Sequence, residues 1–212
     1  MFELLIKGGP VMIPIGLCAL VATVIIVERL LFFRAIGRSD KRLLTKVKPL
    51  VAQGRFEEVA KLCDENESPL ARLLMAGIEY RDLSEIDLKE AVMNAANREV
   101  PRVERFMSAL GTIANISTLL GLLGTVTGNI RAFGVLASTG AMGNPALLAG
   151  AIAEALITTA AGLIISIPAT VFYNYFVTRA NKTITDMESS VGDLVLIIAA
   201  RDRKGREASR AL

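Results

Sequence analysis

Long stretches of this sequence contain almost no charged residue, and they constrain the fold more than any other feature. No Asp, Glu, Lys or Arg occurs within residues 8–27 or 106–130, and residues 132–178 contain only Glu154. A helix of about 20 apolar residues crosses the hydrocarbon core of a bilayer. We therefore predict an all-α membrane protein with three transmembrane helices.

The composition narrows the possible functions. Of the 212 residues, 52% are hydrophobic, which is too many for an ordinary soluble domain. Histidine is absent, so His-based catalysis and His-ligated metal sites are excluded. Cys18 and Cys63 form no CxxC pair, and the glycine-rich GLLGTVTG lacks the lysine of a phosphate-binding loop. We expect no enzyme activity, no cofactor, no metal and no nucleic-acid binding.

Basic residues predict the orientation of the chain. They gather after the first and third apolar stretches: Arg34, Arg38, Lys41, Arg42, Lys46 and Lys48, then Arg179, Lys182, Arg201, Arg203, Lys204, Arg206 and Arg210. Only Lys7 and Arg131 oppose this pattern. Because cytoplasmic loops carry the excess of Lys and Arg, the N-terminus should lie outside and the C-terminus in the cytoplasm.

These patterns divide the chain into four segments. Residues 1–33 form the N-terminal segment with span one, and residues 34–105 form a cytoplasmic helical region. Spans two and three occupy residues 106–178, with a short outer turn at 136–147 around a sequence rich in Gly, Ser, Asn and Pro. Residues 179–212 form a cytoplasmic C-terminal helix with a basic tail.

The cytoplasmic segments carry their own helix signals. Ser68 before Pro69 and Ser84 three residues before Asp87 predict helix starts. The helix that begins at Ser84 should run on towards span two, with a bend at Pro101. After span three, apolar residues recur at helical spacing and should pack against the cytoplasmic helices: Ile184, Met187, Val191, Leu194, Val195 and Ile198.

Hydroxyl and small residues form stripes on spans two and three. Thr118 and Thr125 share a face of span two near Gly121 and Gly128, whereas Thr127 points the opposite way. On span three, one stripe holds Thr159, Ser166, Thr170 and Tyr173, with Ala155 and Gly162 at its edges, and another holds Glu154 and Thr158. Such stripes usually pack helices, and Gly124 with Gly128 forms a GxxxG motif. Facing hydroxyl stripes also favour a lining for an ion pathway, so both interpretations stay open.

Glu154 is the one carboxylate within the third apolar stretch. It lies some ten residues past the outer turn, which places it about 15 Å along the helix, and an unpaired carboxylate is costly there. It either belongs to the ion path, as a titrating relay, or makes a structural contact between subunits or at the pore entrance. Arg131 or a cation of a partner could neutralise it.

These motifs resemble the MotA/TolQ/ExbB family of proton-channel proteins, and within it the TolQ/ExbB branch. The resemblance rests on "SPLARLLMAGIE", on "LGTIANISTLLGLLGTVTGNIRAF" at span two and on "AGAIAEALITTAAGLIISIPATVFYNYF" at span three. The flagellar stator branch is less similar because it has four spans. Extra hydroxyls at Thr118, Thr127 and Thr158 and the positive charge of Arg131 depart from the family pattern.

The resemblance implies roles for individual residues. Thr125 corresponds to the threonine of the family's GTV motif, and Thr159 to the threonine five residues after Glu154. With Thr118 and Thr158 they are the expected ion-pathway residues, whereas Glu154 would serve subunit contact or the pore entrance. The expected helix-packing residues are Gly121, Gly124, Gly128, Gly162 and Pro168.

The resemblance also implies a function. It predicts an ion-driven energiser subunit of the bacterial inner membrane, arranged as a homopentameric ring around a dimer of a single-span partner similar to ExbD or TolR. Proton flow, or Na⁺ flow because neutral oxygens also suit a hard cation, would drive the partner's motion. A TonB- or TolA-like transducer would carry the work to an outer-membrane or cell-wall system that this sequence does not identify. The alternative is a passive scaffold or channel ring that organises a partner without coupling to ion flow.

Overall fold

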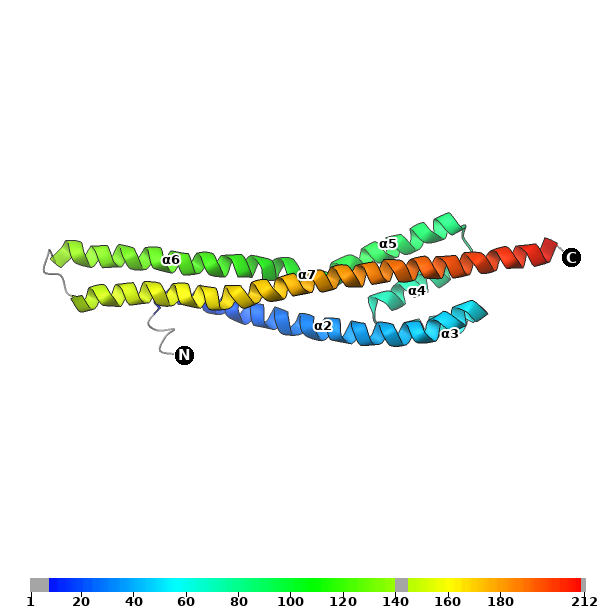
Figure 1. Cartoon of the computed structure of the whole chain (residues 1–212), viewed down its shortest axis with the longest axis horizontal. Helices are drawn as coiled ribbons and strands as arrows, with labels where there is room; N and C mark the ends of the chain where they lie inside the picture. Colours follow the sequence, from blue (N-terminus) through cyan, green and yellow to red (C-terminus); the bar gives the residue numbers. More distant parts are fainter. Residues whose placement is uncertain (1–7, 140–144, 211–212) are drawn as a thin grey trace. The chain divides into compact units, whose positions relative to one another are not determined.

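The computed structural model describes residues 8–139 and 145–210, and within them it is built from helices without strands (Figure 1). The helices are α2 (Met12–Gln53), α3 (Phe56–Asp64), α4 (Pro69–Glu79), α5 (Glu85–Val103), α6 (Met107–Thr139) and α7 (Pro145–Arg210). Three helical segments, 12–53, 85–137 and 145–198, are long and apolar enough to cross a membrane. This confirms the prediction of an all-α membrane protein with three spans.

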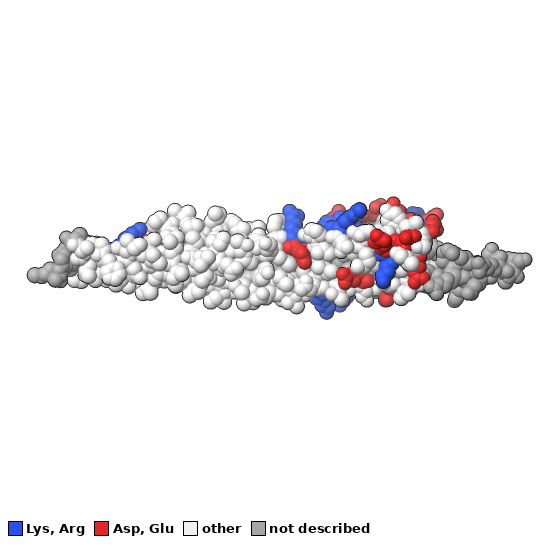
Figure 2. Space-filling view, turned by 90° about the horizontal axis from the view of Figure 1, so that it is seen from above, with Lys and Arg blue, Asp and Glu red and all other residues white. Residues whose placement is uncertain are grey.

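The chain divides into two compact units. The first, which we call the apolar unit, comprises Met1–Arg29 and Phe106–Phe176. The second, the polar unit, comprises Leu30–Arg105 and Val177–Leu212. The boundaries between the two units lie within a few residues of the boundaries predicted between membrane and cytoplasmic segments. Helices α2 and α7 each continue across such a boundary as a single helix. On the face shown in Figure 2, charged side chains gather over one part of the described surface and are nearly absent from the other part.

Within the apolar unit, α6 packs antiparallel to the first part of α7 through small residues. Near the start of α6, a Cβ added to Gly111 would lie 3.0 Å from Cε2 of Tyr173. Further along, Gly121 packs against the backbone of Thr159, and Gly128 packs against Ala155. Glycine on both helices lets their backbones approach closely, as is usual for helices in membranes.

Large apolar side chains cover the outside of the apolar unit. Leu17 on α2, Phe133 on α6 and Ile164 on α7 are 63%, 71% and 70% exposed in the single chain. Exposed apolar surface of this kind would be unfavourable in water, but it suits helices surrounded by lipid or by other membrane helices.

The polar unit has a conventional hydrophobic core. Leu73 and Val92 are fully buried, and Leu194 of α7 packs against Gly77 of α4. The predicted apolar stripe after span three is buried from Met187 to Ile198, which confirms that it packs against other helices. The helix starts are also as predicted. The Ser68 hydroxyl accepts a hydrogen bond from the backbone N–H of Ala71, and the Ser84 hydroxyl accepts one from that of Asp87.

The helix that was expected to run from Ser84 into span two is interrupted shortly after Pro101, at residues 104–106. Pro101 is inside α5, which continues to Val103, and the helix ends over residues 104–106 before α6 begins. Proline removes one backbone hydrogen bond, but the loss of this bond does not end α5 at Pro101. The break is made by Phe106, whose φ of 65° is left-handed and costs an L-residue roughly 1–2 kcal/mol.

The outer turn expected at 136–147 is shorter at both ends. Helix α6 continues to Thr139, and α7 begins at Pro145, which occupies the first helical position that proline favours. The remaining residues, 140–144, lie outside the described part of the chain, as do the N-terminal residues 1–7 with Lys7.

Candidate functional site

Hydroxyl side chains of α6 and α7 meet in pairs inside the apolar unit. The Oγ1 atoms of Thr125 and Thr159 lie 2.8 Å apart, and Oγ1 of Thr118 donates to Oγ of Ser166 at 2.7 Å. We call these four residues the hydroxyl column. Because α6 and α7 are antiparallel, the two pairs lie at successive levels along the same helix contact.

The Thr125–Thr159 pair is also tied to the backbone. Both hydroxyls lie within hydrogen-bond distance of the carbonyl oxygen of Gly121, at 3.2 Å from Thr125 and 3.0 Å from Thr159. Oγ1 of Thr159 lies 3.1 Å from the carbonyl oxygen of Ala155. Each hydroxyl has one proton to donate, so this set offers more oxygen lone pairs than protons. Both threonines remain partly exposed in the single chain.

The Thr118–Ser166 pair extends the column. Thr118 is exposed, whereas Ser166 is 8% exposed and lies between the helices. Ser166 belongs to the stripe predicted on span three but was not among the expected ion-pathway residues. Its position opposite Thr118 depends on the register of α6 against α7, which a stripe on one helix does not define.

The structure separates Thr158 from the hydroxyl column. Thr158 is 1% exposed, its Oγ1 donates to the carbonyl oxygen of Ala155 at 2.8 Å, and its side chain packs directly against Gly124. Within the described part of the chain, Thr127 makes only a local bond, to the carbonyl oxygen of Gly124 at 3.0 Å. Thr158 therefore fills the helix contact, and Thr127 lies outside the column.

The expected packing residues differ in their surroundings. Gly121, Gly124 and Gly128 of α6 all face α7, and a Cβ added to Gly162 would lie 2.5 Å from the carbonyl oxygen of Ser117. Pro168, by contrast, is exposed in the single chain. The glycines thus bring the two helices to the distance at which the hydroxyl pairs form.

Glu154 has a counter-ion within its own chain. Nη1 of Arg131 on α6 donates to both carboxylate oxygens of Glu154, at 2.6 Å each. The two side chains are 50% and 22% exposed for Arg131 and Glu154. Glu154 therefore needs no neighbouring subunit for its neutralisation.

A third segment contacts the Glu154 carboxylate. Gly9, which precedes α2, has a φ of 67°, and Oε1 of Glu154 lies where its Cβ would be. The backbone N–H of Met12 donates to the carbonyl oxygen of Gly9 at 3.1 Å and closes the corner. Only glycine permits both the positive φ and the contact with the carboxylate. No motif in the sequence indicates this role, because the contact joins Gly9 to a residue 145 positions further along the chain.

Arg29 is a further residue that the sequence patterns did not single out. It is 2% exposed, its Nε donates to Oε2 of Glu28 at 2.5 Å, and its guanidinium carbon lies 5.9 Å from the centre of the Phe106 ring. A buried arginine paired in this way stabilises local geometry only while its partners are present. It fixes α2 against the start of α6, where the chain leaves the left-handed turn.

The hydroxyl column can coordinate ions, but it has no group that is ionised at neutral pH. Threonine and serine hydroxyls are neutral donors and acceptors. Neutral oxygens in a membrane suit a dehydrated cation or a chain of hydrogen-bonded waters. Among the described residues, no cluster of three or more His, Cys, Asp or Glu side chains could hold a metal ion.

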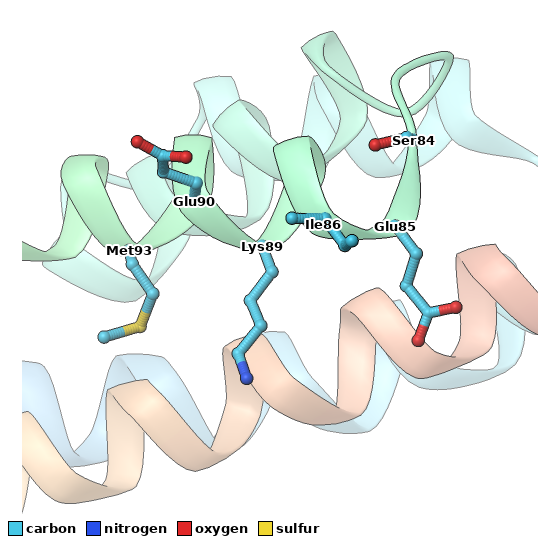
Figure 3. A pocket seen from close by; sticks show the side chains of 6 residues that line it. All are labelled: Ser84, Glu85, Ile86, Lys89, Glu90 and Met93. Carbon is cyan, nitrogen blue, oxygen red and sulfur yellow. The ribbon is translucent and has the colours of Figure 1, made fainter.

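A hollow on the polar unit offers no comparable chemistry. It is lined by Ser84, Glu85, Ile86, Lys89, Glu90 and Met93 at the start of α5 (Figure 3). Figure 3 shows Glu85 and Lys89 extending from one side of the helix and Glu90 from the other. Ile86 is 79% exposed, and the charged groups do not converge on a common point.

Comparison with known proteins identifies the family. The model of the MotA/TolQ/ExbB proton channel family matches residues 65–189, which include α6 and the hydroxyl column. The chain belongs to the MotA/TolQ/ExbB proton channel family. The ExbB-like 3 biopolymer transport protein of Synechocystis sp. is 31% identical over 192 residues, which cover 90% of this chain and 91% of that protein.

Further relatives place this family member in the TolQ/ExbB branch. The biopolymer transport protein ExbB of Salmonella typhimurium is 38% identical over 172 residues, covering 77% of this chain and 66% of that protein. The Tol-Pal system protein TolQ of Haemophilus influenzae is 38% identical over 105 residues, covering 49% of this chain and 45% of that protein. The chain is therefore a multi-pass membrane protein of a family of biopolymer-transport energisers.

Proposed function

We propose that this protein is the ring-forming subunit of an ion-driven energiser in the bacterial inner membrane. In this proposal, copies of the chain form a homopentamer around a dimer of a single-span partner similar to ExbD or TolR. Ion passage along the inner surface of the ring moves the partner, and a TonB- or TolA-like transducer passes the work to an outer-membrane or cell-wall system. The N-terminus lies outside and the C-terminus in the cytoplasm, as the basic residues predict.

The observation that supports this function most directly is the hydroxyl column. Thr125 and Thr159 are paired at 2.8 Å, are partly exposed on one side of the α6–α7 contact, and keep unused oxygen lone pairs. Helices that only face lipid gain nothing from exposed hydroxyls. In the proposed ring this side faces the lumen and the partner.

The column is compatible with either H⁺ or Na⁺ as the coupling ion. Its hydroxyls would solvate Na⁺ directly, whereas H⁺ would need a titrating carboxylate, which the partner's aspartate would supply. We propose H⁺, with Na⁺ as the alternative that the uptake measurements described next distinguish.

The test replaces column hydroxyls in the full chain, which is co-expressed with an ExbD- or TolR-like single-span protein and reconstituted in vesicles. A hydroxyl that solvates an ion contributes roughly 1.5–3 kcal/mol, so Thr159→Val and Thr125→Val should slow ion uptake about tenfold or more. Uptake is followed with a pH-sensitive dye and, in parallel vesicles, with ²²Na⁺ as tracer.

Thr127→Val is the matched control, because Thr127 makes only the local bond to Gly124. It should leave uptake close to the unmodified rate. Loss of uptake in Thr127→Val with normal uptake in Thr125→Val would place the pathway elsewhere. Ordered rings without uptake of either ion would support the passive scaffold instead.

A further inference from the structure

We propose that Arg131 is a positioning residue that holds Glu154 as a permanent carboxylate and keeps it out of the ion path. Glu154 is then a structural anchor, and the coupling ion passes along the hydroxyl column without protonating it. This inference rests on the proposed function for its consequence, but its first test needs neither partner nor ion flow.

The geometry supports a fixed pair. One guanidinium nitrogen, Nη1 of Arg131, lies 2.6 Å from both oxygens of Glu154, so the carboxylate is bound through both of its oxygens. Arginine stays protonated under all relevant conditions, and a charge-assisted hydrogen bond is stronger than a neutral one. If the carboxyl group accepted a proton, it would lose one of these contacts, and the positive charge of Arg131 would be left without a counter-ion.

The surroundings of Glu154 give it no other charged neighbour among the described residues. The corner formed by residues 8–12, which includes Gly9, has no titratable side chain, and neither has the rest of α7 from 145 to 178 apart from the two tyrosines. From α6, Arg131 is the charged residue that reaches the carboxylate. Arg131 is therefore the charged group to which the Glu154 carboxylate is bound.

The Gly9 corner fixes the carboxylate from the other side. Oε1 lies where a Cβ of Gly9 would be, so the carboxylate is held between the corner and the guanidinium. The hydroxyl of Thr158, one turn along α7, points instead to the carbonyl oxygens of Glu154 and Ala155, at 3.2 and 2.8 Å. No hydroxyl of the column is among the hydrogen-bond partners described for the Glu154 carboxylate.

The first experiment is an infrared titration of the purified full chain in lipid nanodiscs between about pH 5 and 8. The signal of interest is a carboxylic-acid C=O band that a protein shows and that the same protein carrying Glu154→Gln lacks. We expect no such band in the unmodified protein or in Arg131→Lys, which keeps the charge, and a clear band in Arg131→Gln. Lys7→Gln is the control variant, because it removes a positive charge two residues before Gly9 in the sequence. It should behave as the unmodified protein.

Two results would overturn the proposal. A band in the unmodified protein that is lost in Glu154→Gln would mean that the carboxylate titrates despite Arg131. Absence of a band in Arg131→Gln would mean that the carboxylate stays charged without Arg131, so that Arg131 does not have the proposed role. Neither result depends on the partner or on transport, so the proposed function could survive either.

A double-mutant cycle measures the coupling of the pair. The side chains are partly exposed, so the coupling should lie between that of surface and buried pairs, which corresponds to about a 5- to 30-fold change in the unfolding constant. Arg131→Gln and Glu154→Gln should each destabilise the protein, and the double variant should recover part of the loss. Strict additivity would mean that the two side chains do not act on each other.

The consequence for transport is a change of pH profile. If vesicles with the partner take up protons, the plot of uptake rate against pH for Arg131→Gln should show an inflection that the plot for the unmodified protein lacks. Glu154→Gln introduced into Arg131→Gln should remove it. Persistence of the inflection without Glu154 would refute the role given to Arg131.

Discussion

Gly124 offers a direct test of how closely α6 and α7 pack. A Cβ at this position would meet the side chain of Thr158, including its Cγ2 atom at 3.0 Å. Thr158 cannot turn aside freely, because it is 1% exposed and its hydroxyl donates to the carbonyl oxygen of Ala155. Gly124→Ala should therefore force the helices apart.

The magnitude follows from a comparison within the same helix. Overpacking of a close contact costs about 1–3 kcal/mol, whereas Gly→Ala inside a helix contributes about 1 kcal/mol of stability. Gly134→Ala is the matched control, because a Cβ there would meet nothing within 4 Å. Both variants gain the same helix stability from Gly→Ala, so their free energies of unfolding should differ by the cost of overpacking alone, about 1–3 kcal/mol.

Unfolding is followed by circular dichroism during titration with SDS, because the chain has no Trp for fluorescence. Gly124→Ala should unfold at lower SDS than the unmodified protein, and Gly134→Ala at equal or higher SDS. Adding Thr158→Ala to Gly124→Ala removes the hydroxyl and methyl groups and should recover part of the loss. Equal stability of the two single variants would refute the close contact between Gly124 and Thr158.

Three further predictions concern other parts of the chain. Gly9→Ala would need a left-handed φ and would displace the Glu154 carboxylate, so it should lower stability by at least about 1–2 kcal/mol in the same SDS titration; unchanged stability would contradict the corner. Burial raises the pKa of the Asp40 carboxyl above its ordinary 3.8, and the Ser68 hydrogen bond only partly offsets this. The folded state thus binds the proton more tightly, stability should fall as pH rises through the raised pKa, and Asp40→Asn should flatten that dependence in thermal unfolding. Burial also raises the pKa of the Cys63 thiol to about 11, so in a Cys18→Ser variant maleimide should label it slowly at neutral pH until the protein is denatured; rapid labelling of the native protein would count against its burial.

The spans and helix starts were predictable because local rules decide them. An uncharged run of sufficient length has one stable conformation in a bilayer, and Ser68 and Ser84 cap helices through bonds to residues only three positions away. The break before α6 was not predictable in the same way. Pro101 gives the strongest local signal, but the left-handed residue is Phe106, a side chain that rarely adopts this conformation.

The site was predictable as two faces but not as pairs. Helical spacing alone placed Thr118 with Thr125 and Thr159 with Ser166. Which residue meets which depends on the register between α6 and α7, and the glycines that face α7 set that register. Thr158 illustrates this, since its burial against Gly124 depends on that register and not on its position along α7 alone.

The charge arrangement bears on what one chain can do in the proposed mechanism. The column contributes hydroxyl oxygens that are not ionised at neutral pH, and the one carboxylate of the third span is bound by Arg131 in the same chain. In the proposed ring such subunits would stabilise a passing cation, but the described part of their spans offers no unpaired carboxylate to load and unload a proton. Proton coupling then requires a carboxylate supplied by the partner, whereas Na⁺ coupling requires only oxygens. If uptake without the partner is negligible for H⁺ but measurable for Na⁺, the column itself is the ion-binding element, and the partner's carboxylate selects the proton.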